Sequence, residues 1–194
     1  MIKKNNTVLI KEAKLLGQLL KKNKAHLVLA ESCTGGMIAS ALTQVPGVST
    51  YFCGSAVVYR DLTKNQWLKI PKNLIQKHGD VSEVITLKLA KELLNKTTEA
   101  DLSLAITGHL GPNSPQKLDG VIFISIAMRQ SFAQRLFSPQ SSFPQKDLIG
   151  FVHKQRLLPS KKPPSLLSIR QSRQLSASHS ALLMVRSLLE FSAK

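Results

Sequence analysis

Hydrophobic and polar positions along the first 128 residues alternate in blocks that predict helices and strands in turn. In residues 7–22, Leu9, Ala13, Leu16 and Leu20 fall on one face of a helix. Short apolar runs bounded by turn residues predict strands at 27–30, 55–59, 102–106 and 120–127. Helices are expected between them, at 34–43, at 63–68, and from a cap at Asp80 or Ser82 to about residue 95. This order predicts an α/β fold, a single-domain sandwich with a mixed central sheet flanked by helices.

The pattern changes after Met128. Residues 130–168 are basic and rich in Ser and Pro, and their apolar positions keep no clean period. We interpret this segment as a long loop, a partly disordered stretch or a divergent structure. Apolar residues at helical spacing then predict an amphipathic helix over 176–191. The chain therefore divides into a core at 1–128, a divergent basic segment at 129–168, and a C-terminal helix at 169–194 that completes the domain.

The chain is strongly basic. Its 194 residues include 27 Lys and Arg against 11 Asp and Glu, a formal net charge of +16. Residues 121–194 hold 11 basic residues against only Asp147 and Glu190, a net charge of +9, whereas residues 1–120 hold 16 against nine. Charge of this size favours nonspecific contacts with phosphate groups. However, the ten aromatic residues form no base-stacking platform, and no nucleic-acid-binding motif is present.

Composition restricts the class of protein further. A hydrophobic content of 43% is enough to fill one core. No apolar run is long enough to cross a membrane, and no leader-peptide pattern follows Met1, so we expect a cytoplasmic protein without a membrane partner. The two cysteines, Cys33 and Cys53, suit reduced thiols better than a disulfide framework.

Candidate chemistry begins at the first predicted strand, which runs into Ala30-Glu31-Ser32-Cys33-Thr34-Gly35-Gly36. A serine at a strand-to-helix turn, followed by two glycines, is suited to act as a nucleophile near the free N–H groups of a helix start. The simpler alternative is that the turn only caps the helix. Lys64 stands 32 positions later, and serine with lysine is an established hydrolytic pair.

These residues resemble the CinA C-terminal domain family. The resemblance covers roughly residues 11–128 and is carried by Ala30 to Gly36, Tyr59, Lys64, Gly79 to Glu83, Thr107-Gly108 and Gly111-Pro112. Members with an assigned activity are nicotinamide-nucleotide amidases, which convert nicotinamide mononucleotide to nicotinate mononucleotide and ammonia. The resemblance implies that activity here, as well as a homo-oligomer. Larger members carry an extra N-terminal domain, and the short lead at 1–24 predicts a standalone form.

The resemblance also implies roles for individual residues. Ser32 is the expected nucleophile, Lys64 the general base, and Tyr59 the residue that relays or orients the proton. Residues expected at the substrate come from the same motif: Glu31, Thr34, Gly35 and Gly36, the last three offering backbone N–H groups to an oxyanion. This scheme requires no metal and no cofactor, and the five histidines show no familiar metal-ligand spacing.

The substrate's phosphate predicts a second, anion-binding part of the site. The glycine-containing loop with Thr107, Gly108 and Gly111 is one candidate, although it is shorter and poorer in glycine than in relatives. The family's usual arginine-containing segment is not intact. Residues 143–147 and the stretch from Arg170 to Arg173 are its possible remnants, and Arg173 is the predicted phosphate ligand.

A second hypothesis from another class remains open. The chain would keep the fold but have weak or no amidase activity, and would act as an accessory protein that contacts nucleic acid nonspecifically through its charge. Salt-sensitive binding to random duplex DNA separates the two hypotheses, because its absence excludes the second.

Overall fold

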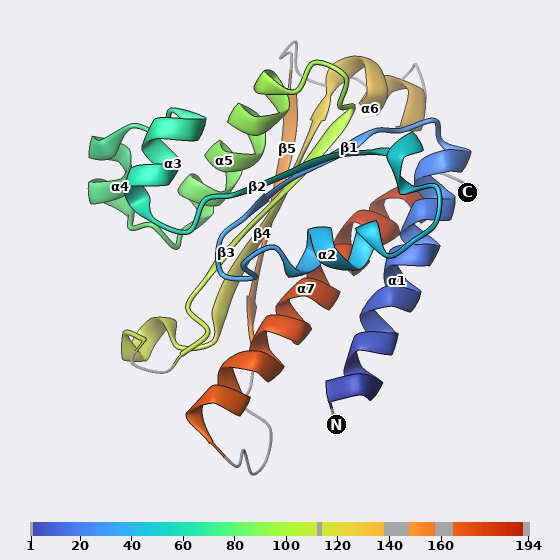
Figure 1. The fold of residues 1–194 in the computed structure, drawn as a ribbon. Coiled ribbons are helices and arrows are strands. Elements are labelled where there is room, and N and C mark those ends of the chain that lie inside the picture. The colour runs from blue at the N-terminus through green and yellow to red at the C-terminus, as the bar shows by residue number, and fades with distance from the viewer. Residues whose placement is uncertain (1, 112–113, 138–147, 158–164, 192–194) are drawn as a thin grey trace.

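The computed structural model describes residues 2–111, 114–137, 148–157 and 165–191. In these parts the chain forms seven α-helices and five strands (Figure 1). The helices are α1 (Ile2–Lys22), α2 (Met37–Thr43), α3 (Asp61–Leu68), α4 (Lys72–His78), α5 (Glu83–Lys96), α6 (Gln130–Phe137) and α7 (Leu166–Phe191). The strands are β1 (Leu27–Glu31), β2 (Phe52–Val57), β3 (Leu102–Gly108), β4 (Val121–Arg129) and β5 (Leu148–Arg156).

The five strands form one open mixed sheet in the order β2-β1-β3-β4-β5. Strand β1 pairs in parallel with β2 and β3, whereas β4 is antiparallel to β3 and β5. Helix α5 covers one face together with α3 and α4, and α1, α2 and α7 cover the other (Figure 1). From β1 the chain continues to β2 on one side of β1 and later to β3 on the other side. Strand β1 is therefore a topological switch point, where α/β sheets commonly bind ligands.

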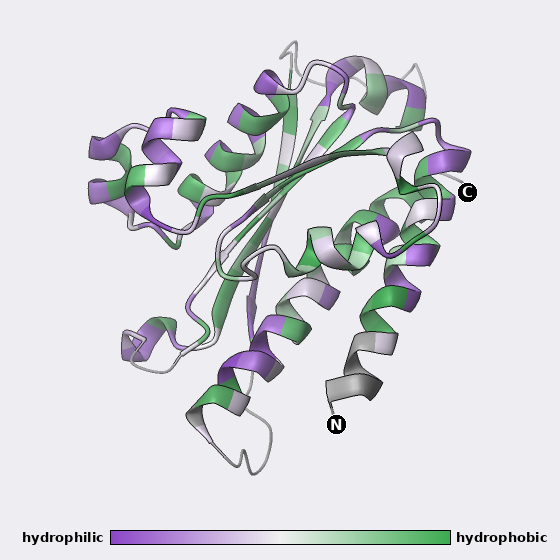
Figure 2. Cartoon of the chain, in the orientation of Figure 1, coloured by the Kyte–Doolittle hydropathy of each residue, from purple (hydrophilic) through white to green (hydrophobic). Residues whose placement is uncertain are grey.

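Alternate residues of each strand enter the two cores that the layers create. Leu27 and Leu29 of β1 pack in the core below α1, α2 and α7, whereas Val28 and Ala30 pack in the core below α5. This alternation follows from the two-residue period of a strand. Both faces are covered, which explains why β1 and β3 are largely apolar runs in the sequence. Figure 2 shows the apolar sides of the helices turned toward the sheet.

The predicted α/β sandwich with a mixed sheet is confirmed, but several elements differ from the prediction. The basic segment after Met128 contains α6 and β5, and the terminal helix begins at Leu166 rather than near residue 176. Helix α6 is too short to establish a period, and β5 is a partly exposed edge strand. The first turns of α7 are held by polar groups, which left no apolar stripe to recognise.

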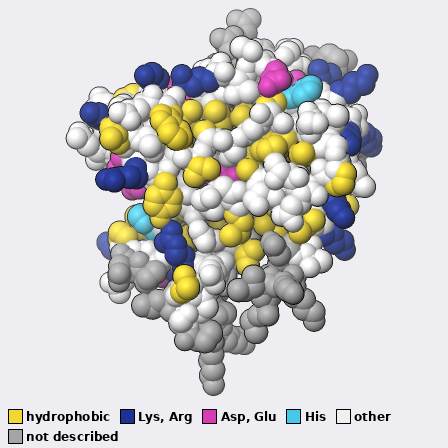
Figure 3. All heavy atoms as spheres, viewed as in Figure 1, with side chains coloured by type: hydrophobic (Ala, Val, Ile, Leu, Met, Phe, Trp, Pro, Cys, Tyr) yellow, Lys and Arg dark blue, Asp and Glu magenta, His cyan; other side chains and the backbone are white. Residues whose placement is uncertain are grey.

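Surface features add three observations. On the face of the molecule in Figure 3, hydrophobic side chains lie across the middle and Lys and Arg lie around the rim rather than in one stripe. Both cysteines are free thiols, as predicted. In the described part of the chain, no helix is both long enough and apolar enough to cross a membrane.

Candidate functional site

A pocket lies where the carboxyl ends of β1, β2 and β3 meet. Because these strands are parallel and in register at Glu31, Val57 and Ile106, the residues that follow each of them reach the same edge of the sheet. The cavity has a volume of about 180 Å³. It is lined by Ser32, Cys33, Tyr59, Asp80, Val81, Gly108, His109, Leu110, Gly111, Ser114 and Arg170.

Ser32 is fixed at this edge directly after β1. Its backbone N–H donates to the carbonyl of Ile106 at 3.1 Å, which extends the pairing of β1 with β3 by one residue. The residue is only 6% exposed, yet it lines the pocket. The adjacent Cys33 is less suited to act as the nucleophile, because burial raises the pKa of its thiol to about 12.

Glu31 holds the turn that carries Ser32. Its fully buried carboxylate accepts the hydroxyl of Thr34 at 2.8 Å and that of Ser55 at 3.2 Å. It also accepts the backbone N–H groups of Gly36, Ile38 and Ala39 at 2.9–3.1 Å. The carboxylate therefore caps the start of α2 from the preceding strand and satisfies donors that a helix start leaves free.

This cap changes the roles expected for the motif residues. The N–H of Gly36 is bonded to Glu31, and the N–H of Gly35 donates to the carbonyl of Ser32 at 3.1 Å. Neither group is therefore free for an oxyanion in this conformation. Glu31 was expected to contact substrate, and in this conformation both of its carboxylate oxygens accept hydrogen bonds from within the protein.

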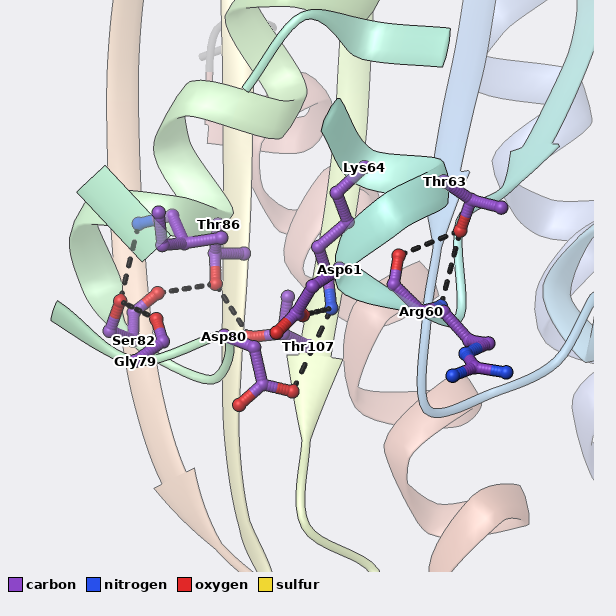
Figure 4. Close-up of polar contacts among 10 residues, drawn as sticks. Arg60, Asp61, Thr63, Lys64, Gly79, Asp80, Ser82, Thr86 and Thr107 are labelled. Atoms are coloured by element: carbon purple, nitrogen blue, oxygen red, sulfur yellow. Dashed lines mark hydrogen bonds and ion pairs between the residues drawn. The ribbon is translucent and has the colours of Figure 1, made fainter. Parts of the chain in front are cut away.

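Lys64 lies behind the pocket wall. Its side chain, from helix α3, is 0% exposed, and its Nζ lies 3.1 Å from Asp61 Oδ1 and 3.7 Å from Asp80 Oδ2 (Figure 4). Two carboxylates therefore face the buried amine. Asp80 lines the pocket together with Ser32, so it connects Lys64 to the site.

Tyr59 stands at the mouth of the pocket, beyond the end of β2. Its ring is exposed, and its hydroxyl accepts a hydrogen bond from Arg170 at 2.7 Å. Arg170, from the first turns of α7, also donates to the carbonyl of Gly111 at 3.0 Å. One guanidinium group thus joins Tyr59 to the glycine loop, and both line the cavity.

The glycine loop is shaped by close packing. A Cβ on Gly108 would lie 2.7 Å from Ile122 and 3.1 Å from the Cys33 sulfur, so only glycine fits there. The side chain of the neighbouring Thr107 is buried and hydrogen-bonds to Thr86 at 2.7 Å. Thr107 therefore reaches α5 rather than the pocket, which differs from the expected substrate contact.

Arg173 has a different task from the one predicted. The residue is 5% exposed and binds both carboxylate oxygens of Asp119, at 2.7 and 2.8 Å. Hydrogen bonds from Arg173 lower the pKa of Asp119, and this outweighs the opposing effect of burial. The pair ties α7 to the loop before β4, so Arg170, one turn earlier, is the arginine that faces the pocket.

The sequence interpretation did not assign Asp80 or His109 to the site. The structure gives the helix cap to Ser82, which accepts the N–H of Ile85, and leaves Asp80 at the pocket. The candidate at residues 143–147 lies outside the described residues. Within the described ranges, no group of three or more His, Cys, Asp or Glu is placed to hold a metal ion.

The fold and the pocket define an α/β protein with a ligand site at its switch point. Residues 10–145 match the CinA C-terminal domain, which is well over half of the chain. The chain belongs to the CinA C-terminal domain family.

Curated relatives include two named CinA-like proteins. That of Prochlorococcus marinus is 43% identical over 127 residues, covering 63% of this chain and 27% of its own. That of Thermotoga neapolitana is 42% identical over 111 residues, covering 56% and 27%. The chain thus matches about a quarter of the length of these relatives.

Solved structures agree on the fold. A CinA superfamily protein from Klebsiella pneumoniae aligns with a TM-score of 0.76 at 18% identity, over 94% of this chain and 98% of its own. A competence/damage-inducible protein from Agrobacterium tumefaciens aligns with a TM-score of 0.74 at 24% identity, over 93% and 95%.

Proposed function

We propose that this protein is a nicotinamide-nucleotide amidase that hydrolyses the carboxamide of nicotinamide mononucleotide to a carboxylate and ammonia. The observation that carries the proposal is the placement of Ser32 on the wall of a polar pocket, with the Lys64 side chain joined to that pocket through Asp80. Family membership supports it, since the Ser-Lys pair lies within the matched residues.

The proposed reaction uses Ser32 once, as the nucleophile, and Lys64 in both halves, as the group that accepts and returns a proton. Its hydroxyl oxygen attacks the carboxamide carbon while Lys64 takes the hydroxyl proton, and a tetrahedral oxyanion forms. The N–H of Thr34 is the remaining candidate of the three donors expected in the motif. The C–N bond then breaks, Lys64 returns the proton to the leaving nitrogen, and ammonia departs. Water attacks the acyl-serine ester and Lys64 accepts its proton; the ester C–O bond then breaks, Lys64 returns that proton to the Ser32 oxygen, and the acid is released.

Arg170 is the proposed phosphate ligand. Its guanidinium lies at the pocket and bonds to Tyr59 and to the Gly111 carbonyl, both neutral groups, so it retains charge for an anion. Arg173, by contrast, is neutralised by Asp119. We therefore assign the phosphate to Arg170 and a structural role to Arg173.

Ammonia release from nicotinamide mononucleotide, nicotinamide riboside and free nicotinamide tests the proposal. We expect turnover of the mononucleotide, weaker turnover of the riboside and none of nicotinamide. Lys64→Met, which keeps an unbranched side chain one atom shorter and removes the amine, should lower kcat by at least about a hundredfold. No ammonia from any of the three by the folded protein refutes the proposal. Salt-sensitive binding to random duplex DNA would then favour the accessory, nucleic-acid-binding alternative.

A further inference from the structure

The carboxylate of Asp80 lines the pocket but has no role in the proposed steps of amide hydrolysis. It lines the same cavity as Ser32, and its Oδ2 lies 3.7 Å from the Nζ of the fully buried Lys64. The other carboxylate at Lys64, that of Asp61, belongs to the same helix and lines a separate cavity beside Leu62 and Lys72. Of the two carboxylates paired with Lys64, that of Asp80 is therefore the one that also lines the Ser32 pocket.

The loop that carries Asp80 is held on both sides. Gly79 ends α4 with a φ of +79°, and its N–H donates to the carbonyl of Ile75 at 2.8 Å. Ser82 begins α5 by accepting the N–H of Ile85 at 3.3 Å, and its hydroxyl donates to Gly79 O at 3.0 Å. Two helix ends thus fix the two residues between them.

Hydrogen bonds continue from this loop to the sheet (Figure 4). The Thr86 hydroxyl donates to the carbonyl of Ser82 at 2.6 Å and therefore accepts from the Thr107 hydroxyl at 2.7 Å. Both threonine side chains are buried, and Thr107 precedes Gly108 of the pocket wall. The loop that carries Asp80 is therefore held in place relative to the pocket, while 42% of the Asp80 side chain is exposed.

We propose that Asp80 is a positioning residue for Lys64: its carboxylate holds the amine at the wall of the Ser32 pocket, where the amine takes the serine proton. The inference rests on the proposed roles of Ser32 and Lys64. Without the Asp80 charge, the ion pair with Asp61 is left to place the amine, and Asp61 lines a different cavity.

Asp80→Asn tests this role, because it removes the charge and keeps the shape. Glu92→Gln is the matched control, since it removes one carboxylate from an ion pair with Lys88 within α5. Both variants and the wild type are assayed across pH in two ways. One assay is labelling of Ser32 by a fluorophosphonate, followed by mass spectrometry, and the other is ammonia release from nicotinamide mononucleotide.

For Asp80→Asn we expect the rate of Ser32 labelling to fall about tenfold, because the amine that takes the serine proton is less well placed. The maximal kcat should fall about tenfold while KM stays within about twofold, because the amine is less well placed but substrate contacts remain. Glu92→Gln should follow the wild type. Asp80→Glu, which restores the charge, should return the labelling rate and kcat toward their wild-type values, and it replaces Asp80→Asn as the test if that variant does not fold.

Profiles of Asp80→Asn that coincide with those of Glu92→Gln overturn the inference, and so does an Asp80→Glu variant whose labelling rate and kcat fall as far as expected for the asparagine. If ammonia is released normally in that case, the proposed function stands. If labelling falls as expected but no variant releases ammonia, the role of Asp80 holds and the proposed substrate is wrong. A wild type that neither labels at Ser32 nor releases ammonia refutes both.

Discussion

Replacing Glu31 by glutamine removes a buried charge while preserving the shape of the side chain. The carboxylate accepts five hydrogen bonds, three from backbone N–H groups at the start of α2 and two from the hydroxyls of Thr34 and Ser55. A glutamine offers one acceptor oxygen and an NH2 group that is itself a donor. If the NH2 group replaces Oε1, it faces the N–H of Ala39, and that donor loses its partner.

The cost follows from these contacts. Each of the three bonds retained at Oε2 falls from a charge-assisted to a neutral bond, a loss of about 1 kcal/mol each. The unpaired N–H adds about 1–3 kcal/mol. Removing the charge also relieves the penalty of burying it, which offsets part of the loss. We therefore expect Glu31→Gln to lower the free energy of unfolding by about 3 kcal/mol and to loosen the Ser32 turn.

Urea unfolding followed by circular dichroism measures this change. Glu92→Gln, which alters a single partly exposed ion pair with Lys88, is the control and should stay within about 1 kcal/mol of the wild type. If Glu31→Gln is no less stable than Glu92→Gln, the carboxylate does not hold the start of α2 in the way described here.

Three further predictions concern other parts of the protein. The pKa of Asp119 is lowered in the folded state, so its stabilising contribution is present above its unfolded pKa and is lost as pH falls through the folded pKa. Asp119→Asn should therefore be less stable than wild type near neutral pH and approach it in acid, and urea unfolding at a series of pH values checks this. Because burial raises the pKa of Cys33 to about 12, iodoacetamide at about pH 8 should modify Cys33 only after unfolding. Rapid modification of Cys33 in the native protein would contradict that. Arg170→Met should raise KM for nicotinamide mononucleotide at least about tenfold but leave KM for the riboside nearly unchanged. Steady-state kinetics with both substrates measures this, and an equal change in the two KM values would contradict the phosphate role.

Apolar patterning predicted the central sheet because β1, β3 and β4 are buried on both faces and appear in the sequence as largely apolar runs, interrupted only by Ser103 in β3 and Ser125 in β4 before their last residues. Strand β5 was not predicted, since it lies at the edge of the sheet, carries polar residues such as Lys154 and Arg156, and is half exposed. The start of α7 was missed for a related reason. At the start of α7 the buried face is formed by Arg173. Arg173 can be buried there because it pairs with Asp119, which lies far away in the sequence.

The candidate site was predictable from the sequence where a residue is placed by its neighbours in the chain rather than by tertiary packing. Ser32 follows β1 directly, so a strand-to-turn pattern was enough to place it at the sheet edge. Asp80 was seen only as a possible helix cap, because its approach to Lys64 depends on how α3 and α5 pack. The choice between Arg170 and Arg173 likewise depends on which side of α7 meets Asp119, and no local pattern encodes that contact.

The central claim is that Ser32 is the nucleophile, and ammonia release by Ser32→Ala tests it most directly. Ser40→Ala is the matched control, because Ser40 is an exposed serine on the adjacent helix α2. With nicotinamide mononucleotide as substrate, we expect Ser40→Ala to retain wild-type turnover and Ser32→Ala to lose at least about a thousandfold in kcat, with both variants folded by circular dichroism. Wild-type turnover by Ser32→Ala would contradict the account.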